Sequence, residues 1–239
     1  MLRVLDLFSG IGGFSLGLER TGGFETVAFC EIYPYAQKVL KKHWPDVPIY
    51  EDIRSFDGVP ADVICGGYPC QPYSVAGKRL GGADPRSLDK EMLRITERIK
   101  PTWFIGENVR GHIDLGLDAV CDELERLGYS VWPVGIPACA VGLPTMEWHL
   151  WIVATTDGDR LQRFRAATVS GVERVSRQFQ GSDKGISERW SVPSSRVCGV
   201  GEGVPAWMDR LKCLGNAVVP QIPEIIGYAI LEAENANRP

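Results

Sequence analysis

The chain has 239 residues, a length that suits one large domain or one domain with a small second lobe. Hydrophobic residues make up 44% and charged residues 23%, as in an ordinary globular protein. The opening residues MLRVLDLFSG lack a signal-peptide core, and no apolar run reaches the roughly 18 residues of a membrane span. We therefore expect a cytoplasmic protein without membrane contact.

The seven cysteines are odd in number, form no CxxC pair and are accompanied by only three scattered histidines. Structural zinc sites use closely spaced cysteine and histidine ligands, so we expect no bound metal. Charge is also uneven, because residues 160–196 hold eight cationic and three anionic side chains in a chain of net charge −4. Such a basic segment is either a phosphate-binding surface or a solvated loop, and composition alone does not decide.

Apolar runs alternate with amphipathic stretches along the first 155 residues. The runs predict strands at 2–8, 25–31, 48–53, 61–67, 102–109 and 149–155. The amphipathic stretches predict helices at 14–22, 35–44, 90–100 and 117–129, with a further helix at 222–234. This alternation indicates an α/β fold with a mostly parallel sheet covered on both faces, in which ligands bind beyond the carboxyl ends of the strands.

After about residue 155 the sequence becomes polar, basic and weakly periodic, and this character continues to about residue 206. Long segments of this kind within a domain usually serve a function of their own. We therefore interpret 156–206 as a small separate lobe or functional insertion, and 1–155 with 207–239 as the main domain.

Three glycines, Gly10, Gly12 and Gly13, separate the first predicted strand from the first predicted helix. Glycines at this point let a ligand approach the backbone and the helix N-terminus. Glu31 ends the second strand, where an acid would hold ribose hydroxyls, and Asp52 lies near the end of the third. A glycine loop alone is equally consistent with a tight turn, but together with these acids it favours an adenosine-type ligand.

The stretch CGGYPCQPYS, residues 65–74, places Cys70 in a Pro-Cys turn directly after a predicted strand. A single cysteine is usually a buried packing residue, and a metal role lacks partner ligands. A turn at the ligand edge of the sheet would instead project a thiolate that can act as a nucleophile. Glu107, in GENVRG at the next strand end, could exchange a proton there, or could cap a helix or pair with a cation.

Five motifs occur in a fixed order: DLFSGIGG, GGYPCQPYSVAGKR, DPRS, GENVRG and LGNAVVPQ. In sequence and order they resemble the motifs of cytosine-5 DNA methyltransferases, and the likeness extends from residue 4 to about residue 231. PCQ together with ENV is its most specific part. The resemblance implies a Rossmann-like class I methyltransferase fold with a small basic target-recognition region at 156–206.

The resemblance also implies a reaction. Cys70 would add to C6 of a cytosine flipped out of double-stranded DNA, Glu107 would bind the N3 and N4 edge, and C5 would take the methyl group of S-adenosylmethionine. Asn108 and His149 complete the expected catalytic group. The residues expected to bind the cofactor are Phe8, Gly10, Ile11, Gly12, Glu31, Ile32, Asp52, Ile53, Pro69, Asn216 and Val218. The residues expected to bind DNA are Gln71, Ser74, Arg110, Arg163, Arg165, Arg174 and Arg177.

Two stretches depart from the family pattern. After AVGLP the family has Gln or His and then an Arg-x-Arg run, whereas this chain has TMEWH, residues 145–149. Glu147 and His149 therefore stand at the arginine positions, one of which normally lies against the flipped cytosine. Glu147 reverses the charge, and His149 is a titratable partial replacement. In RSLDKEM, Asp89 and Lys90 stand where the family tends to have an apolar or aromatic residue.

Three interpretations remain open. The first is an active methyltransferase with an altered pocket, and the second is an enzyme that transfers a different group from a modified S-adenosylmethionine, such as a carboxymethyl donor. The third is a catalytically weak DNA-binding relative. Intact Cys70 and Glu107 favour the first, in a bacterial or phage restriction-modification setting where a cognate restriction endonuclease is a candidate partner.

Overall fold

The computed structural model of the chain describes residues 1–69, 88–141, 148–180, 209, 213 and 217–235. The strands are β1 (Leu2–Leu7), β2 (Phe24–Cys30), β3 (Ile49–Tyr50), β4 (Val63–Gly67), β5 (Trp103–Val109), β6 (Ser130–Pro137) and β7 (Trp148–Thr155). The helices are α1 (Gly13–Arg20), α2 (Pro34–His43), α3 (Asp89–Ile99), α4 (His112–Leu115), α5 (Leu117–Arg126), α6 (Gly158–Gln180) and α9 (Gln221–Asn235), and η2 (Ala138–Val141) is a 3-10 turn.

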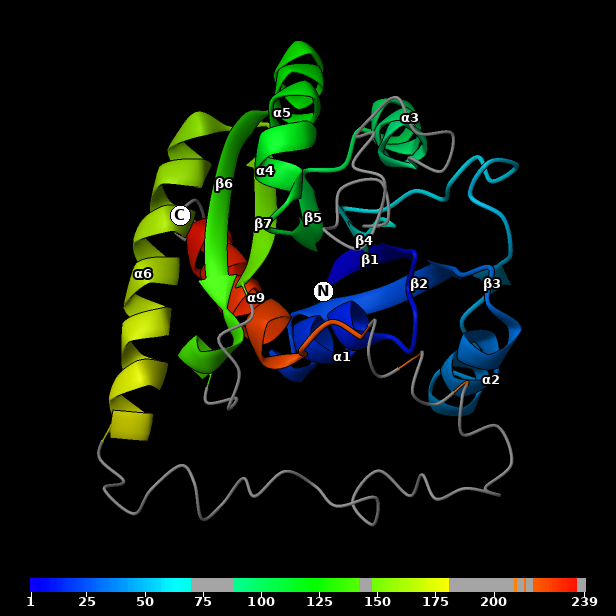
Figure 1. The fold of residues 1–239 in the computed structure, drawn as a ribbon, viewed down its shortest axis with the longest axis horizontal. Helices are drawn as coiled ribbons and strands as arrows, with labels where there is room; N and C mark the ends of the chain where they lie inside the picture. The colour runs from blue at the N-terminus through cyan, green and yellow to red at the C-terminus, as the bar shows by residue number, and fades with distance from the viewer. Residues whose placement is uncertain (70–87, 142–147, 181–208, 210–212, 214–216, 236–239) are drawn as a thin grey trace.

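The seven strands form one sheet in the order β3-β2-β1-β4-β5-β7-β6 (Figure 1). All neighbours are parallel except β7, which runs antiparallel to both β5 and β6. The predicted α/β fold with a mostly parallel sheet is therefore confirmed. The chain extends from β1 first toward β3 and then toward β5, so the strand order reverses between β1 and β4, where sheets of this kind bind ligands.

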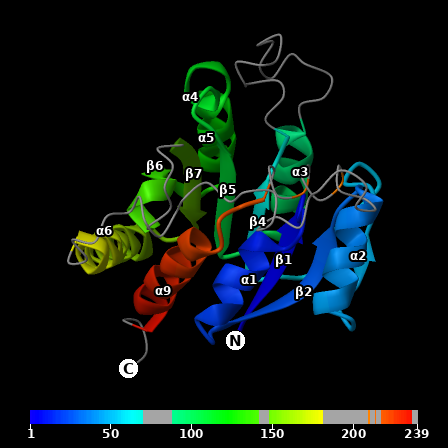
Figure 2. The same ribbon diagram turned by 60° about the horizontal axis from the view of Figure 1, so that its bottom comes forward.

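Helices cover both faces of the sheet, with α1, α6 and α9 on one side and α3 and α5 on the other (Figure 2). Phe14 and Phe164 belong to the core on the first side, and Met92 belongs to the core on the second. Within β5, Trp103 and Phe104 are fully buried and serve opposite faces. Burial on both faces explains why the parallel strands read as continuous apolar runs.

Two glycines of α1 bring the C-terminal segment close to the glycine loop. A Cβ on Gly13 would lie 2.4 Å from the carbonyl oxygen of Val218, and one on Gly17 would lie 2.2 Å from that of Pro220. Only glycine fits at these two positions, because real Cβ atoms do not come so close to a carbonyl oxygen. The segment before α9 is thereby docked on α1, at the edge of the sheet where the glycine loop begins.

Four elements were not predicted from the sequence: the short helix α4, the strand β6, the 3-10 turn η2 and the helix α6. In β6, Pro133 and Pro137 interrupt the apolar pattern, and they are tolerated because β6 is an edge strand. Residues 158–180 form the helix α6, in which the Phe164 ring lies 5.4 Å from that of Trp103 and 5.8 Å from that of Trp132. The first turns of α6 therefore pack on the sheet, and the extent of the target-recognition region stays a prediction.

In the part of the chain that the structure describes, no helix is both long enough and apolar enough to span a membrane. The longest, α6, has 23 residues and holds several arginines along its length. Its apolar side chains Leu161 and Phe164 pack into the core of the protein instead.

Candidate active site

The loop between β1 and α1 has left-handed backbone at three positions, since φ is 53° at Phe8, 54° at Gly10 and 85° at Gly12. A left-handed phenylalanine is uncommon and is typical of functional sites. A Cβ on Gly12 would lie 2.6 Å from the Trp44 ring, whereas one on Gly10 would meet nothing within 4 Å. Gly12 is thus needed for packing, while the backbone at Gly10 is open to a ligand.

Asp6 lies buried beneath this loop, and sequence analysis did not single it out. Its Oδ2 accepts hydrogen bonds from the Ser15 hydroxyl at 2.7 Å and the Ser15 N–H at 3.3 Å. Burial raises the pKa of Asp6 to about 8, and the bonds from Ser15 only partly oppose this rise. Asp6 therefore holds the first turn of α1 through Ser15. Sequence analysis did not indicate this role, because Asp6 lies within an apolar run.

Glu31 joins the end of β2 to the glycine loop. Its Oε2 accepts a hydrogen bond from the Gly10 N–H at 2.7 Å, and its Oε1 accepts one from the Tyr33 N–H at 2.7 Å. Each carboxylate oxygen has a second lone pair, so Glu31 can still accept hydrogen bonds from ribose hydroxyls. Ile32 follows it with 62% of its surface exposed, an apolar side chain beside the place predicted for an adenosine.

Asp52 and Ile53 follow the short strand β3. Asp52 accepts hydrogen bonds from Arg54 Nε at 3.0 Å and Arg54 Nη2 at 2.8 Å, and these bonds lower the pKa of Asp52. Ile53 is buried, with 4% of its surface exposed. Its side chain packs in the core on the α3 side, and Phe8 of the glycine loop packs against the same core.

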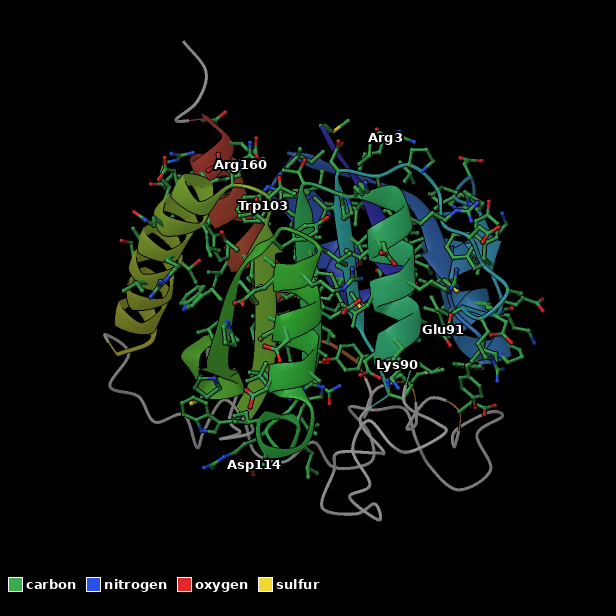
Figure 3. The ribbon with its side chains drawn as sticks, turned by 90° about the horizontal axis from the view of Figure 1, so that it is seen from above. Arg3, Lys90, Glu91, Trp103, Asp114 and Arg160 are labelled. Carbon is green, nitrogen blue, oxygen red and sulfur yellow. The ribbon has the colours of Figure 1, made fainter. Side chains whose placement is uncertain are left out.

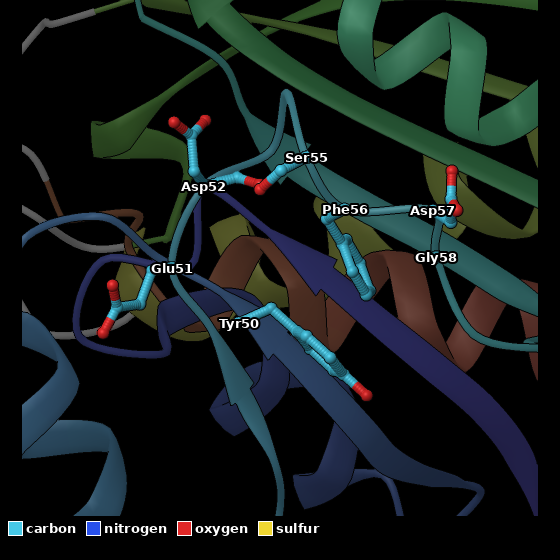
Figure 4. A pocket seen from close by; sticks show the side chains of 7 residues that line it. All are labelled: Tyr50, Glu51, Asp52, Ser55, Phe56, Asp57 and Gly58. Atoms are coloured by element: carbon cyan, nitrogen blue, oxygen red, sulfur yellow. The ribbon is translucent and has the colours of Figure 1, made fainter.

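A cavity of about 370 Å³ lies beside Asp52 (Figure 4). It is lined by Tyr50, Glu51, Asp52, Ser55, Phe56, Asp57 and Gly58. The rings of Tyr50 and Phe56 stack with their centroids 4.2 Å apart and form one wall. Asp52 is the one predicted cofactor residue among these lining residues.

The exit from β4 leads through Tyr68 and Pro69 toward Cys70, and it is held by two buried polar side chains. Asn108 Nδ2 donates a hydrogen bond to the Tyr68 carbonyl oxygen at 3.2 Å, and the Tyr68 hydroxyl lies 3.0 Å from His112 Nε2. Burial lowers the pKa of His112 to about 4, so this ring is neutral at pH 7. Sequence analysis missed Tyr68 and His112, whose pairing joins residues 44 positions apart.

Glu107 and His149 meet at the ends of β5 and β7. His149 Nδ1 lies 2.6 Å from Glu107 Oε1, and the two side chains are 26% and 13% exposed respectively. Gly67 lies opposite Glu107 in the register of β4 and β5, and it leaves room for the carboxylate. The structure thus brings together two predicted catalytic residues. His149, which stands at an arginine position of the family motif, lies directly against Glu107.

Several predicted site residues lie outside the described part of the chain, namely Cys70, Gln71, Ser74, Asn216 and the motif residue Glu147. Val218 is described and lies against Gly13, beside the glycine loop. No group of histidine, cysteine and acidic side chains among the described residues has the arrangement of a metal site.

Among the predicted DNA-binding arginines, the structure describes the side chains of Arg110, Arg163 and Arg165. Arg110 is exposed just beyond β5, at the same sheet edge as Glu107. Arg163 Nε instead donates a hydrogen bond to the Ala233 carbonyl oxygen at 3.3 Å, and the Arg165 guanidinium lies 5.4 Å from the centre of the Trp132 ring. Arg174 and Arg177 fall within the last turns of α6.

Arg110 and Arg163 lie toward opposite ends of the sheet. Figure 3 shows Arg160 and Trp103 at one end of the molecule and Asp114 at the other. Arg160 pairs with Glu234 at 3.1 Å, and Arg163 follows it by one turn of α6. Asp114 lies in α4, directly after the carboxyl end of β5. Arg163 is therefore remote from the edge that holds Glu107.

Comparisons with known proteins identify the family of the chain. The model of the family C-5 cytosine-specific DNA methylase matches residues 2–170. The type II methyltransferase M.HgiBI of Herpetosiphon aurantiacus is 44% identical over 139 residues, which cover 54% of this chain and 32% of that protein. M.Eco47II of Escherichia coli is 38% identical over 162 residues, covering 63% and 39%. The chain thus spans about a third of the length of these curated relatives.

A likeness in structure extends over the whole chain. The Entamoeba histolytica methyltransferase EhMeth superposes with a TM-score of 0.67 at 14% identity, covering 100% of this chain and 99% of that one. At this identity the match shows a shared fold alone. The family model, by contrast, matches more than two thirds of the sequence, a range that contains the glycine loop, Glu31, Cys70, Glu107 and His149. The chain therefore belongs to the C-5 cytosine-specific DNA methylase family.

Proposed function

We propose that the chain transfers a methyl group from S-adenosylmethionine to C5 of cytosine in double-stranded DNA, through a transient bond between Cys70 and C6. The proposal rests on one observation within a chain of this family. Glu107, paired with His149, lies at the end of β5, and its register partner Gly67 ends the strand that leads to Cys70. The Glu107 carboxyl group therefore lies opposite the end of the strand that precedes Cys70 by three residues in the sequence.

The described residues fit the proposed cofactor. The backbone at Gly10 faces open space, the Glu31 carboxylate keeps acceptor capacity beside it, and Ile32 offers an exposed apolar surface. An adenosine needs these three features: a close backbone, an acceptor for ribose hydroxyls and a flat apolar contact for the base. When bound, S-adenosylmethionine supplies an electrophilic methyl group.

The protein's own residues would prepare cytosine to accept that group. C5 of cytosine is a poor nucleophile until the Cys70 thiolate adds to C6 and sends electron density into the ring. Glu107 would hold the N3 and N4 edge and place a proton at N3 as negative charge develops there. Asn108 would fix the backbone before Cys70 through its bond to the Tyr68 carbonyl. Loss of the C5 proton and of Cys70 then restores the base.

The partners follow from the same reaction. A cytosine inside a duplex is unreachable for a thiol on a sheet edge, so the base must be flipped out. Arg110, exposed at that edge, is suited to contact a DNA phosphate. The relatives named type II methyltransferases support a restriction-modification setting, a cytoplasmic location and a cognate endonuclease as partner.

One experiment tests the reaction. The full chain is incubated with duplex DNA and S-adenosylmethionine, the DNA is digested to nucleosides, and cytosine products are weighed by mass spectrometry. We expect 5-methylcytosine with the wild-type protein and none with Cys70→Ala, while Cys139→Ala, at an exposed cysteine outside the family motifs, keeps the product. A heavier cytosine adduct formed only with cell extract would indicate a different donor, and bound but unmodified DNA would contradict the proposal.

A further inference from the structure

Glu107 and His149 form a diagonal pair across the antiparallel strands β5 and β7. Glu107 is in register with Trp151, and His149 is in register with Val109, so the two side chains are two positions apart on one face. Nδ1 and Oε1 lie 2.6 Å apart, which requires a proton between them. The position that holds arginine in the family motif thus holds a side chain that shares a proton with Glu107.

Histidine differs from arginine in that it can release a proton near neutral pH. An arginine beside Glu107 would keep its charge at every working pH and would release no proton. An imidazole releases a proton near neutral pH, and it can do so through a hydrogen bond that already exists. Both side chains are partly buried, which limits the access of bulk water to Glu107. A proton donor within the protein, such as His149, is therefore useful there.

We propose that His149 is the proton store of Glu107, supplying through it the proton that reaches N3 of the cytosine. This inference rests on the proposed function. As the bond from Cys70 to C6 forms, the His149 Nδ1–H bond breaks and an O–H bond forms on the Glu107 carboxylate. That O–H bond breaks as N3–H forms, which restores the carboxylate and leaves a neutral imidazole. The proton returns along the same path when the bond from C6 to Cys70 breaks.

The surroundings of the pair contain few other ionisable groups within the described strands. The register neighbours are Gly67 in β4, Trp151 in β7, Val109 in β5 and Ile136 in β6, none of which ionises. The ionisable side chains on the elements that follow these strands at this edge are Tyr68, Arg110, His112, Asp114 and Cys139. Of these, Arg110 is exposed and His112 is neutral, as its burial requires.

The first test needs no enzymatic activity. The three histidines of the chain are followed by nitrogen-15 NMR during a pH titration of the wild-type protein and Glu107→Gln. We expect the His149 midpoint to fall by about 1 pH unit or more in Glu107→Gln, because a carboxylate partner favours imidazolium. The exposed His43 should titrate identically in both proteins. An unchanged His149 midpoint would overturn the inference even if the chain methylates DNA.

The second test measures methyl transfer as a function of pH. In His149→Gln we expect kcat to fall about 100-fold with little change in KM for DNA, because a neutral amide cannot supply the proton. We expect kcat of the wild type to fall on the alkaline side, and in His149→Arg this fall should disappear or move, since arginine does not titrate there. His43→Gln, a matched change at an exposed site, should keep the wild-type profile. Superimposable profiles for wild type and His149→Arg, or a kcat of His149→Gln within about twofold of wild type, would contradict the inference.

Discussion

Gly67 and Glu107 face each other across β4 and β5 at a distance that leaves no room for a side chain on the glycine. A Cβ on Gly67 would lie 2.7 Å from Glu107 Oε2. Gly67→Ala must therefore displace the carboxylate and disturb its contact with His149. Since a shift of about 1 Å in a reacting group can cost up to about 100-fold in rate, we expect kcat to fall at least tenfold.

The matched control for this change is Gly158→Ala. Its Cβ would lie 3.4 Å from the Ser130 hydroxyl oxygen, an ordinary contact, so activity and thermal stability should stay at wild-type levels. Circular dichroism and the nucleoside assay on both variants separate a displaced carboxylate from a misfolded chain. Wild-type kcat in a folded Gly67→Ala variant would show that the carboxylate position does not limit the reaction.

Tyr68 and His112 support the same edge from within the core. Tyr68→Phe removes the hydroxyl that lies 3.0 Å from His112 Nε2 and leaves a buried ring nitrogen without that partner. Because an unmet buried polar group costs about 1 to 3 kcal/mol, urea unfolding should show a loss of that size. We also expect slower methyl transfer, since Tyr68 precedes Cys70 by two residues. Tyr228→Phe, at a half-exposed tyrosine of α9, should change neither quantity.

The sheet could be predicted because its strands are buried on both faces. Runs such as WFI in β5 need no long-range information to be recognised, and the helices between them have a clear apolar face. β6 failed this criterion, because two prolines and an edge position break its pattern. α6 failed it as well, because arginines between its apolar positions made a core helix resemble a solvated segment.

The site could be predicted residue by residue but not as a set of contacts. Motifs located Glu31, Glu107 and His149, yet the 2.6 Å contact between the last two depends on the register of β5 and β7, which is set by the whole sheet. Arg163 was predicted to contact DNA from its place in a basic segment, and this stays a prediction. The sequence did not indicate the hydrogen bond that its Nε donates to the Ala233 carbonyl oxygen near the end of α9.

Asp6 should make the stability of the protein depend on pH. Burial raises its pKa to about 8, well above its ordinary value of 3.8, so the folded state holds a proton that the unfolded chain has released. Stability should therefore be highest near pH 4 with respect to this group and should fall as pH rises toward 8. Asp6→Asn removes the ionisation, and this part of the fall, on the order of 5 kcal/mol for a shift of about four pKa units, should vanish.

Urea unfolding at several pH values between about 4 and 8 measures this effect for Asp6. The comparison with Asp6→Asn isolates it from His112, whose lowered pKa acts in the opposite direction below about pH 6.5. Asp46→Asn, at an exposed aspartate, should leave the wild-type slope unchanged. Parallel pH curves for wild type and Asp6→Asn would mean that Asp6 is ionised in the folded protein.

Arg110 and Arg163 should respond differently to replacement by alanine, although both were predicted to bind DNA. Arg110 is exposed beyond β5 at the edge with Glu107, so Arg110→Ala should weaken DNA binding and reduce the salt slope by about 1. Arg163 bonds the Ala233 carbonyl oxygen at the opposite end of the sheet. Arg163→Ala should therefore lower stability by about 1 kcal/mol and leave DNA affinity unchanged.

Fluorescence anisotropy with a labelled duplex over a series of salt concentrations measures both affinities, and urea unfolding measures both stabilities. We expect Arg110→Ala to change only DNA affinity, because it loses a phosphate contact. We expect Arg163→Ala to change only stability, because it loses a contact between α6 and α9. If Arg163→Ala reduced the salt slope while Arg110→Ala did not, DNA would lie across the α6 end of the sheet. That path would leave Glu107 and His149 without a base to act on.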